Sequence, residues 1–389
     1  MLAEQDVRGR SVCARCVMDT SDPEISFDAH GVCNHCRSYS ELADRELRRD
    51  PGELEGLVRE IRQAGTGKEY DCVIGVSGGV DSTYVAYEVK RLGLRPLAVH
   101  LDNGWDSELA IHNIEQALST LGIDLVTRVL EWDEFRGLQV AFLRASVPDA
   151  EIPTDHAIMA TLYQEASRRG IRYVLSGDNF ATEAILPRRW TYGVHDWRYI
   201  KQIHRRFAGK SLSSFPHVSR LRLDYLSRVR RIRVVGLLDY FPYVKSDAME
   251  LLQRELGWRP YGGKHYESIY TRFFQGYILP TKFGIDKRKA HLSTLICAGQ
   301  MTREEALRSL EENEYLAGRA AEDRVYAVKK LGLTDAEFDE IMCAPAKTYE
   351  DYPNHQNQPV WRILRSLKRR LIGRGSSGEP TARELARRR

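Results

Sequence analysis

Several features that would assign a chain to a broad class are missing from this sequence. No run of 18 apolar residues occurs, and the first residues lack the apolar core of a secretion signal. No internal repeat is evident either. We therefore expect no transmembrane helix and no repeat fold, and we predict a cytoplasmic protein.

Cysteine is scarce, and its arrangement argues against a disulfide framework. The chain has seven cysteines, an odd number, and four of them form the pairs Cys13–Cys16 and Cys33–Cys36. Sixteen residues separate the two pairs, as in a four-cysteine zinc ribbon of a reducing compartment. Because four thiolates leave no open position for a substrate, we expect Zn²⁺ to be structural. A catalytic zinc and redox chemistry are the alternatives.

Basic charge is concentrated at one end and lacking elsewhere. The formal net charge is +4, but residues 362–389 alone carry ten Lys and Arg against two Glu. The rest of the chain is therefore acidic, with a net charge of about −4. This distribution argues against nucleic acid as the main substrate.

The phosphate-binding pattern GxxxxGK[ST] is absent, but another anion-binding pattern is present. The apolar run Cys72–Val76 predicts a buried strand, and the periodicity of 80–91 predicts a helix. Backbone N–H groups of the intervening turn and the positive end of the helix dipole converge on one spot, where we expect an anion. The turn and the first helical residues are Ser77, Gly78, Gly79, Val80, Asp81 and Ser82.

Strands and helices then alternate along the chain. We predict strands over 96–101, 124–129 and 173–175, and helices over 108–121 and 155–169. This alternation is typical of an α/β fold with a doubly wound parallel sheet, whose ligands bind at the carboxyl ends of the strands. Two polar turns follow predicted strands there, Asp102-Asn103 and a second that contains Gly177 and Asp178. Taken alone, either turn could be an Asx turn.

The remaining segments divide the chain into four predicted parts. Residues 37–64 form a charged helical connector, and residues 246–342 are mostly helical. The basic stretch 228–233 suits RNA, a solvated face or an anionic sugar nucleotide, and the sequence leaves these open. We predict a zinc ribbon over 1–45, a nucleotide domain over 46–245, a helical C-terminal region over 246–350 and a basic tail over 351–389.

A polar segment in the helical region stands out. Residues 279–293 include Asp286 and several basic side chains that a helix used only for packing would not need. The alternative is an ordinary charged helix start. The candidates for binding an anionic group are Lys282, Lys287, Arg288 and His291.

The sequence Ser-Gly-Gly-Val-Asp-Ser resembles the pyrophosphate loop of the PP-loop ATP pyrophosphatases, which cleave ATP to AMP and pyrophosphate. In this resemblance residues 77–82 hold the pyrophosphate, Asp81 helps to place Mg²⁺, and the turn at Asp102 lies near the adenosine. Gly177 and Asp178 then lie near the phosphates and the metal. Together with the cysteine pairs and the segment Phe283–Ser293, the loop resembles the N-acetyl sugar amidotransferases of bacterial surface-polysaccharide synthesis over residues 10–345.

That family implies a ligase that uses ATP to convert an acetamido group of a nucleotide sugar to an acetamidino group. A UDP-linked diacetamido uronic acid is the typical substrate. AMP transferred to the amide oxygen makes that oxygen a good leaving group, and ammonia then attacks the carbon. Asp81 and Asp178 suit the placement of ATP, and the four basic side chains suit pyrophosphate or a sugar carboxylate.

Ammonia has to come from elsewhere. A glutaminase needs a cysteine with a histidine partner on a strand-to-helix elbow, whereas Cys72 lies in a predicted strand and Cys297 in a predicted helix. Cys343 follows the last helix with no elbow around it. The family resemblance implies a separate glutaminase and a cyclase-like subunit that channels ammonia.

Two alternative functions stay open beside this hypothesis, and one further element of the chain has to be considered. A tRNA-modifying PP-loop ATPase, similar to the thiolases, is the first alternative, and a non-catalytic zinc-ribbon interaction protein is the second. Residues 362–372 predict an amphipathic basic helix. Such a helix suits an acidic partner, an anionic membrane surface or the acidic body of the chain itself.

Overall fold

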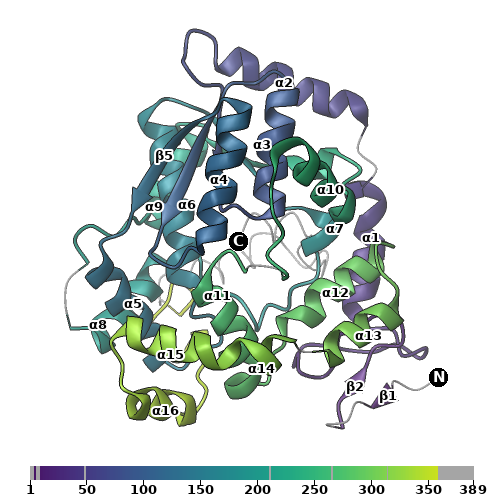
Figure 1. The fold of residues 1–389 in the computed structure, drawn as a ribbon, viewed down its shortest axis with the longest axis vertical. Coiled ribbons are helices and arrows are strands. Elements are labelled where there is room, and N and C mark those ends of the chain that lie inside the picture. Colours follow the sequence, from purple (N-terminus) through teal and green to yellow (C-terminus); the bar gives the residue numbers. More distant parts are fainter. Residues whose placement is uncertain are drawn as a thin grey trace, which may run out of the picture.

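A computed structural model describes residues 4–5, 9–47, 50–209, 212–263, 266–312 and 314–357 (Figure 1). The predicted amphipathic helix at 362–372 lies outside these residues. No helix in the described ranges is long and apolar enough to cross a membrane.

Five parallel strands form the central sheet, in the order β5-β4-β3-β6-β7. The predicted doubly wound α/β fold is therefore confirmed. The order reverses between β3 and β6, and in such sheets this switch point is where ligands bind. The sequence had not indicated β7, which overlaps the basic stretch at 228–233. The strands are β3 (Cys72–Gly75), β4 (Pro96–Asp102), β5 (Asp124–Val129), β6 (Tyr173–Ser176) and β7 (Arg233–Gly236).

Helices cover both faces of this sheet because alternate strand residues point to opposite sides. Ile74 packs into one apolar cluster with α2 (Pro51–Ala64), α3 (Val80–Arg91), α4 (Glu108–Leu121) and α10 (Lys245–Leu256). Val73 packs into the opposite cluster with α6 and α9. The bounds of these two helices are Ile152–Arg168 for α6 and Arg220–Arg228 for α9. Helix α6 begins three residues before the predicted start at Asp155.

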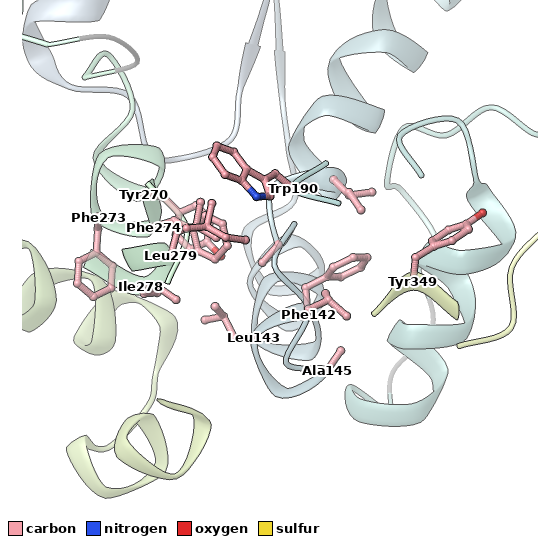
Figure 2. Close-up of a cluster of buried hydrophobic side chains, with 14 of the residues drawn as sticks. Phe142, Leu143, Ala145, Trp190, Tyr270, Phe273, Phe274, Ile278, Leu279 and Tyr349 are labelled. Atoms are coloured by element: carbon pink, nitrogen blue, oxygen red, sulfur yellow. The ribbon is translucent and has the colours of Figure 1, made fainter. Parts of the chain in front are cut away.

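A second, larger core lies beyond the carboxyl edge of the sheet (Figure 2). It combines Trp105, Phe142 and Trp190 with Tyr270 and Phe273, so the nucleotide domain and the predicted helical region share one apolar interior. A ten-residue π-helix, η2 (Phe274–Phe283), continues directly from α11 and contains Pro280. The helices of this part are α5 (Trp132–Arg144), α7 (Phe180–Glu183), α8 (Trp197–Phe207), α11 (Ile269–Phe273), α12 (Lys287–Cys297), α13 (Arg303–Glu311), α14 (Glu314–Gly318), α15 (Ala320–Leu331) and α16 (Asp335–Cys343). Two short 3-10 turns, η1 (Leu237–Tyr240) and η3 (Tyr349–Asp351), complete it.

The N-terminal module contains a short hairpin, β1 (Glu4–Gln5) with β2 (Ser11–Val12), and helix α1 (Asn34–Leu47). Helix α1 begins inside the second cysteine pair, three residues before the predicted connector. The second knuckle therefore leads into a helix, and the module lies next to α12 and α13 (Figure 1).

Candidate nucleotide site and zinc centre

The Ser77–Ser82 loop follows β3 at the switch point of the sheet and leads into α3. Gly78 has φ +80°, a conformation that favours glycine, and a Cβ there would lie 2.7 Å from the carbonyl oxygen of Ala110. The Gly78 carbonyl accepts a hydrogen bond from Trp258 Nε1 at 2.8 Å and another from the Tyr261 hydroxyl. These contacts fix the turn tightly against α4 and the segment after α10.

The first backbone N–H groups of α3 are not capped by the side chain of its N-cap residue. Gly79 is the N-cap residue and has no side chain with which to cap the helix. The Ser82 hydroxyl instead accepts from the Ser77 N–H at 3.2 Å, and the Thr83 hydroxyl donates to the Gly79 carbonyl at 2.8 Å. The first turn of α3 can therefore direct its N–H groups at an anion, as the motif requires.

The loop after β6 lies directly against this turn. A Cβ on Gly177 would lie 3.0 Å from the carbonyl carbon of Asp81, so a larger residue would require the two loops to move apart by a few tenths of an ångström. The Tyr243 hydroxyl donates a short hydrogen bond to Asp81 Oδ1, and the Ser176 hydroxyl donates to Asp178 Oδ2 at 3.1 Å. The fold thus brings together the predicted residues Asp81, Gly177 and Asp178.

Asp102 and Asn103 end β4 on the other side of the loop, and both form local turns. Asp102 Oδ1 accepts from the Gly104 N–H at 2.8 Å, and Asn103 Oδ1 accepts from the Trp105 N–H at 3.0 Å. The Asx-turn geometry that the sequence left open is therefore present. Both residues still lie at the carboxyl edge of the sheet, and their predicted contact with an adenosine stays a prediction.

Sequence reasoning had not assigned Glu267 to the site. The Oε1 atom of Glu267 would lie 3.3 Å from a Cβ placed on Gly79. The Glu267 carbonyl also accepts a hydrogen bond from the Ser107 N–H at 2.8 Å. The C-terminal half of the chain therefore reaches the glycine turn. The density of polar residues around 264–268 was the one signal in the sequence that pointed to this segment.

Two of the four basic candidates act as helix caps. The Lys282 ammonium donates to the carbonyl of Ala344 at 2.7 Å and to that of Ile341, at the end of α16. Arg288 pairs with Asp286 at 2.7 Å and donates to the Leu310 carbonyl at 3.4 Å, near the end of α13. Neither has a hydrogen bond to the described loop residues 77–82. Their predicted contacts with pyrophosphate or a carboxylate stay predictions.

The other two candidates, Lys287 and His291, lie one turn apart on α12, which packs against α7 just after Asp178. His291 is half-buried. The buried Lys287 ammonium donates to Glu151 Oε2 at 3.0 Å, and Gln275 Nε2 donates to the same oxygen at 2.8 Å. Burial would lower the pKa of Lys287 because it takes the charged ammonium out of water, but the nearby carboxylates of Glu151 and Asp149 raise the pKa, so this lysine is positively charged.

The four paired cysteines form the one group of metal-ligating side chains that is suitably placed within the described residues. All four are fully buried, with Sγ–Sγ distances of 3.9 Å for Cys13–Cys36 and 3.7 Å for Cys16–Cys33. Tetrahedral thiolates at a Zn–S bond length of about 2.3 Å would lie roughly 3.8 Å apart. The donor set therefore fits Zn²⁺, which would hold the two knuckles together.

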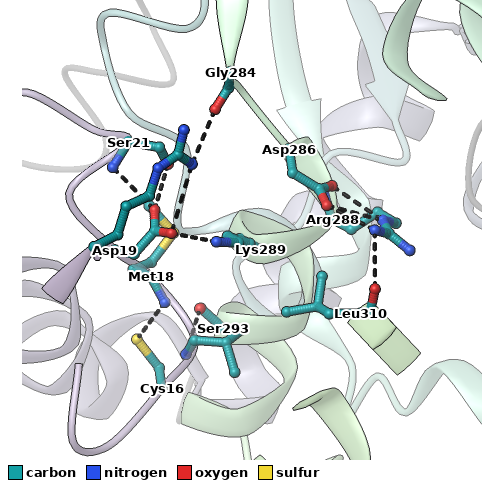
Figure 3. A network of polar contacts seen from close by, with 12 residues as sticks. Cys16, Met18, Asp19, Ser21, Gly284, Asp286, Arg288, Lys289, Ser293 and Leu310 are labelled. Atoms are coloured by element: carbon teal, nitrogen blue, oxygen red, sulfur yellow. Dashed lines mark hydrogen bonds and ion pairs between the residues drawn. The ribbon is translucent and has the colours of Figure 1, made fainter. Parts of the chain in front are cut away.

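The N-terminal module that contains these cysteines, called the zinc module below, contacts α12, the helix that carries Lys287 (Figure 3). The Val17 N–H donates to the Ser293 hydroxyl at 3.2 Å, and Lys289 forms a short ion pair with the buried carboxylate of Asp19. Arg303 donates to the Cys16 carbonyl at 3.2 Å from the start of α13. The module that contains the four cysteines therefore contacts α12 and the start of α13.

Comparison with known proteins adds three findings. A family model described as the C-terminal domain of WbpG-like LPS biosynthesis proteins matches residues 267–368. The glutamine-hydrolysing GMP synthase of Pyrobaculum aerophilum is 33% identical over 111 residues, which cover 28% of this chain and 20% of that protein. The corresponding enzyme of Thermus thermophilus is 33% identical over 105 residues, covering 27% and 20%. The chain thus spans about a fifth of the length of these curated relatives.

Two solved structures are similar at low identity. NMN synthetase from Francisella tularensis has a TM-score of 0.26 and 16% identity, covering 49% of this chain and 99% of that one. The NH3-dependent NAD synthetase from Campylobacter jejuni has a TM-score of 0.29 and 16% identity, covering 53% and 85%.

The parallel sheet and the Ser-Gly-Gly-Val-Asp-Ser loop at its switch point define a domain of the PP-loop ATP pyrophosphatase class. Residues 267–368 are similar to the C-terminal domain of WbpG-like LPS biosynthesis proteins. The resemblance to a surface-polysaccharide family is therefore confirmed.

Proposed function

We propose that this protein is an ATP-dependent, AMP-forming carbon–nitrogen ligase. Its acceptor in this proposal is the acetamido group of a nucleotide-linked sugar, typically a UDP-diacetamido uronic acid, which it converts to an acetamidino group. The observation that carries the proposal is the Ser77–Ser82 loop at the switch point of a chain whose C-terminal part matches a lipopolysaccharide-biosynthesis family.

The reaction follows from the weakness of an amide as an electrophile. The amide oxygen attacks the α-phosphorus of ATP, and pyrophosphate leaves. Ammonia then forms a bond to the imidate carbon, and the C–O bond breaks with AMP as the leaving group. The N–H groups of residues 77–82 would bind the departing pyrophosphate, and water has to be excluded from the activated intermediate.

Magnesium fits the carboxylates at this site. Mg²⁺ is commonly held by one or two carboxylates together with substrate phosphates. Asp81 and Asp178, on adjoining loops, would provide that number. The metal would offset the charge of pyrophosphate.

The cysteines support an external source of ammonia. Burial raises the pKa of the Cys72 thiol well above its usual value, so it is not a nucleophile at neutral pH. Cys297 lies 3.6 Å from Cys36 at the zinc centre. We propose that a separate glutaminase and a cyclase-like channel subunit supply ammonia. The same arrangement disfavours a thiolase-like tRNA-modifying enzyme, which would need a cysteine pair near the nucleotide.

A pyrophosphate-release assay tests the proposal. The purified chain is incubated with ATP, ammonium and a panel of UDP-acetamido sugars, with glutamine and tRNA as control substrates. We expect AMP and pyrophosphate with ammonium and one of the sugars, and no product with glutamine. Asp81→Asn should reduce pyrophosphate release by about 100-fold or more while the melting temperature stays close to that of the parent. ADP and phosphate as products, or efficient use of glutamine, would contradict the proposal.

A further inference from the structure

The outward face of α9 is apolar, although this helix lies on the surface of the protein. Leu223 and Leu226 pack into the apolar cluster that α9 shares with α6. Leu221, Tyr225 and Val229 follow one another at intervals of four residues, so they form a stripe on the side turned away from that cluster. Leu221 is 81% exposed, the highest value for a large apolar side chain in the described residues, and Val229 is 65% exposed. Because this stripe adds nothing to the core, it is a candidate contact surface.

Arginine side chains flank the stripe. Residues 219–233 include six Arg and one Asp, a net charge of +5. The Arg222 guanidinium lies over the Tyr225 ring, 5.0 Å from its centroid. The exposed side chains of Arg228 and Arg231 form no hydrogen bond or ion pair with a described residue. The other three arginines contact the protein itself: Arg220 with Asp224, Arg230 with the Ser167 carbonyl and Arg233 with Glu60.

The turn after α9 has an arginine at a position that favours glycine. Arg231 has φ +55°, and within the described chain only one other non-glycine residue has a positive φ. This conformation is uncommon for a residue with a Cβ, and functional sites are where such strain is often found. Since Arg231 gives the described fold no hydrogen bond or ion pair, the position indicates that its charge serves a partner outside the chain.

We propose that this surface binds an anionic membrane. It is called the α9 surface below and consists of Leu221, Arg222, Tyr225, Arg228, Val229 and Arg231. The apolar side chains would enter the headgroup layer, and the arginines would contact lipid phosphates while their stems lie along the apolar stripe. Figure 1 shows α9 at the left of the molecule, well away from the N-terminal module at the lower right, so such binding would leave that module free.

The charge and chemistry of the α9 surface favour a membrane over other occupants. The C-terminal tail is basic, as is the same surface of a second copy, so both would be repelled. RNA offers phosphates, but its bases stack on flat side chains, whereas two of the three side chains in the stripe are aliphatic. An acidic protein would have to match the spacing of the arginines. A lipid headgroup layer supplies phosphates and apolar depth without a fixed geometry.

Co-sedimentation of the full chain with lipid vesicles tests the inference. We expect binding to vesicles of mixed phosphatidylcholine and phosphatidylglycerol, little binding to pure phosphatidylcholine, and weaker binding as salt is added. The double variant Leu221→Gln/Val229→Gln should lower the partition coefficient about tenfold, because two apolar side chains no longer enter the lipid. Arg228→Gln/Arg231→Gln should lower it about 20-fold. The basic tail is the same in every protein compared, so these differences belong to α9.

Matched controls come from exposed residues of other helices. Val325→Gln in α15 replaces a valine that is 68% exposed, and Arg254→Gln in α10 replaces an arginine whose side chain is 69% exposed. Both should keep the partition coefficient of the parent. The melting temperatures of all these variants should stay close to that of the parent, because each change is on the surface.

Arg231→Gly separates a role in binding from a role in the fold. Glycine adopts a positive φ without strain, so this variant should be at least as stable in thermal melts as the parent. Its partition coefficient should nevertheless fall about fivefold, because one basic charge is lost. A variant that binds vesicles like the parent would overturn the role of Arg231.

Three results would overturn the inference as a whole. The first is vesicle binding that the α9 variants leave unchanged, since the tail would then account for it. The second is a dimer of the parent that Leu221→Gln/Val229→Gln dissociates, which would assign the stripe to a second copy. The third is loss of binding to tRNA, but not to vesicles, in Arg228→Gln/Arg231→Gln. No substrate enters these measurements, so their outcome does not depend on the proposed function.

Discussion

At the scale of single residues, the nucleotide turn depends on a backbone shape that only glycine adopts without strain. Gly78 has φ +80°, and the space for a Cβ is taken by the Ala110 carbonyl at 2.7 Å and the Tyr261 hydroxyl at 2.8 Å. Any side chain would have to shift α4 or the turn itself. The shape of the turn therefore requires a residue without a Cβ at position 78.

Gly78→Ala should consequently disable catalysis. A left-handed conformation costs a non-glycine residue about 1–2 kcal/mol, and the turn would move away from the Ala110 carbonyl. We expect AMP formation to fall by about 100-fold, because small displacements of a binding group have large effects on rate. The control is Gly137→Ala within α5, where nothing lies within 4 Å of the added Cβ. That change should keep full activity, and an equally active Gly78→Ala would show that the turn is not used.

The basic residues illustrate a limit of reasoning from residue type. Lys282 and Arg288 were predicted to bind an anion because of their charge, but the structure shows both donating to carbonyls at helix ends. A cation is equally suited to a phosphate, a carboxylate or a helix C-terminus. Which of these it meets depends on neighbours that are distant in sequence.

At the scale of elements, one carboxylate holds a loop to the start of a helix. Glu134, in the first turn of α5, accepts from the N–H groups of Ser213 at 2.8 Å and Phe215 at 3.1 Å and from the Ser214 hydroxyl at 3.0 Å. Partial burial would raise the pKa of Glu134, but these hydrogen bonds outweigh it and lower the pKa to about 2. The ionised form is therefore the one that the fold favours.

The lowered pKa of Glu134 predicts a pH-dependent contribution to stability. A carboxylate with a folded-state pKa below its unfolded value stabilises the fold above the unfolded pKa and loses this effect as pH falls through the folded pKa. Glu134→Gln should lower the free energy of unfolding by about 1 kcal/mol at neutral pH, allowing for solvent screening. In thermal melts, the gap to the parent should narrow as pH falls below about 4.

The control for Glu134→Gln is Asp133→Asn, its neighbour in α5, whose side chain is 62% exposed and pairs with Arg136 on the surface. Surface pairs contribute little, so its melting temperature should stay near that of the parent. A gap for Glu134→Gln that stays constant across this pH range would mean that its charge is not responsible.

At the scale of the whole molecule, the zinc module packs against the helical region, although most of the sequence separates them. Val17 and Ser293 are separated by 276 residues and joined by one hydrogen bond. Asp19 is fully buried and paired with Lys289, so loss of either partner would leave a charge in the interior. If the four cysteines hold a metal ion, we expect the position of α12, and with it Lys287, to depend on that ion.

Removal of one thiolate should therefore destabilise α12. Cys33→Ser should lose zinc, which we expect at about one ion per chain in the parent. Hydrogen exchange should become faster in α12 as well as in the cysteine knuckles, and AMP formation should fall as a consequence. Cys343→Ser is the control, because that cysteine is exposed and outside the cluster. Unchanged exchange in α12 after loss of the metal would mean that the helix does not need the module.

The sequence by itself determined the features that depend on local order. The helix bounds 80–91 and 108–121 and the strand 124–129 were predicted as observed, because apolar periodicity and capping act over a few residues. The Ser77–Ser82 loop and the cysteine pairs were also evident, since their function resides in contiguous residues. The arrangement of Asp81, Gly177 and Asp178 followed from the rule that parallel strands end at one edge.

Only the tertiary structure decided what depends on distant neighbours. The edge strand β7 was hidden because it has only four residues, follows directly on a basic stretch and is little buried. The approach of Glu267 to Gly79 and the pairing of Lys287 with Glu151 join segments that are more than 100 residues apart. No local pattern marks such contacts, because charged side chains acquire partners only when packing brings helices together.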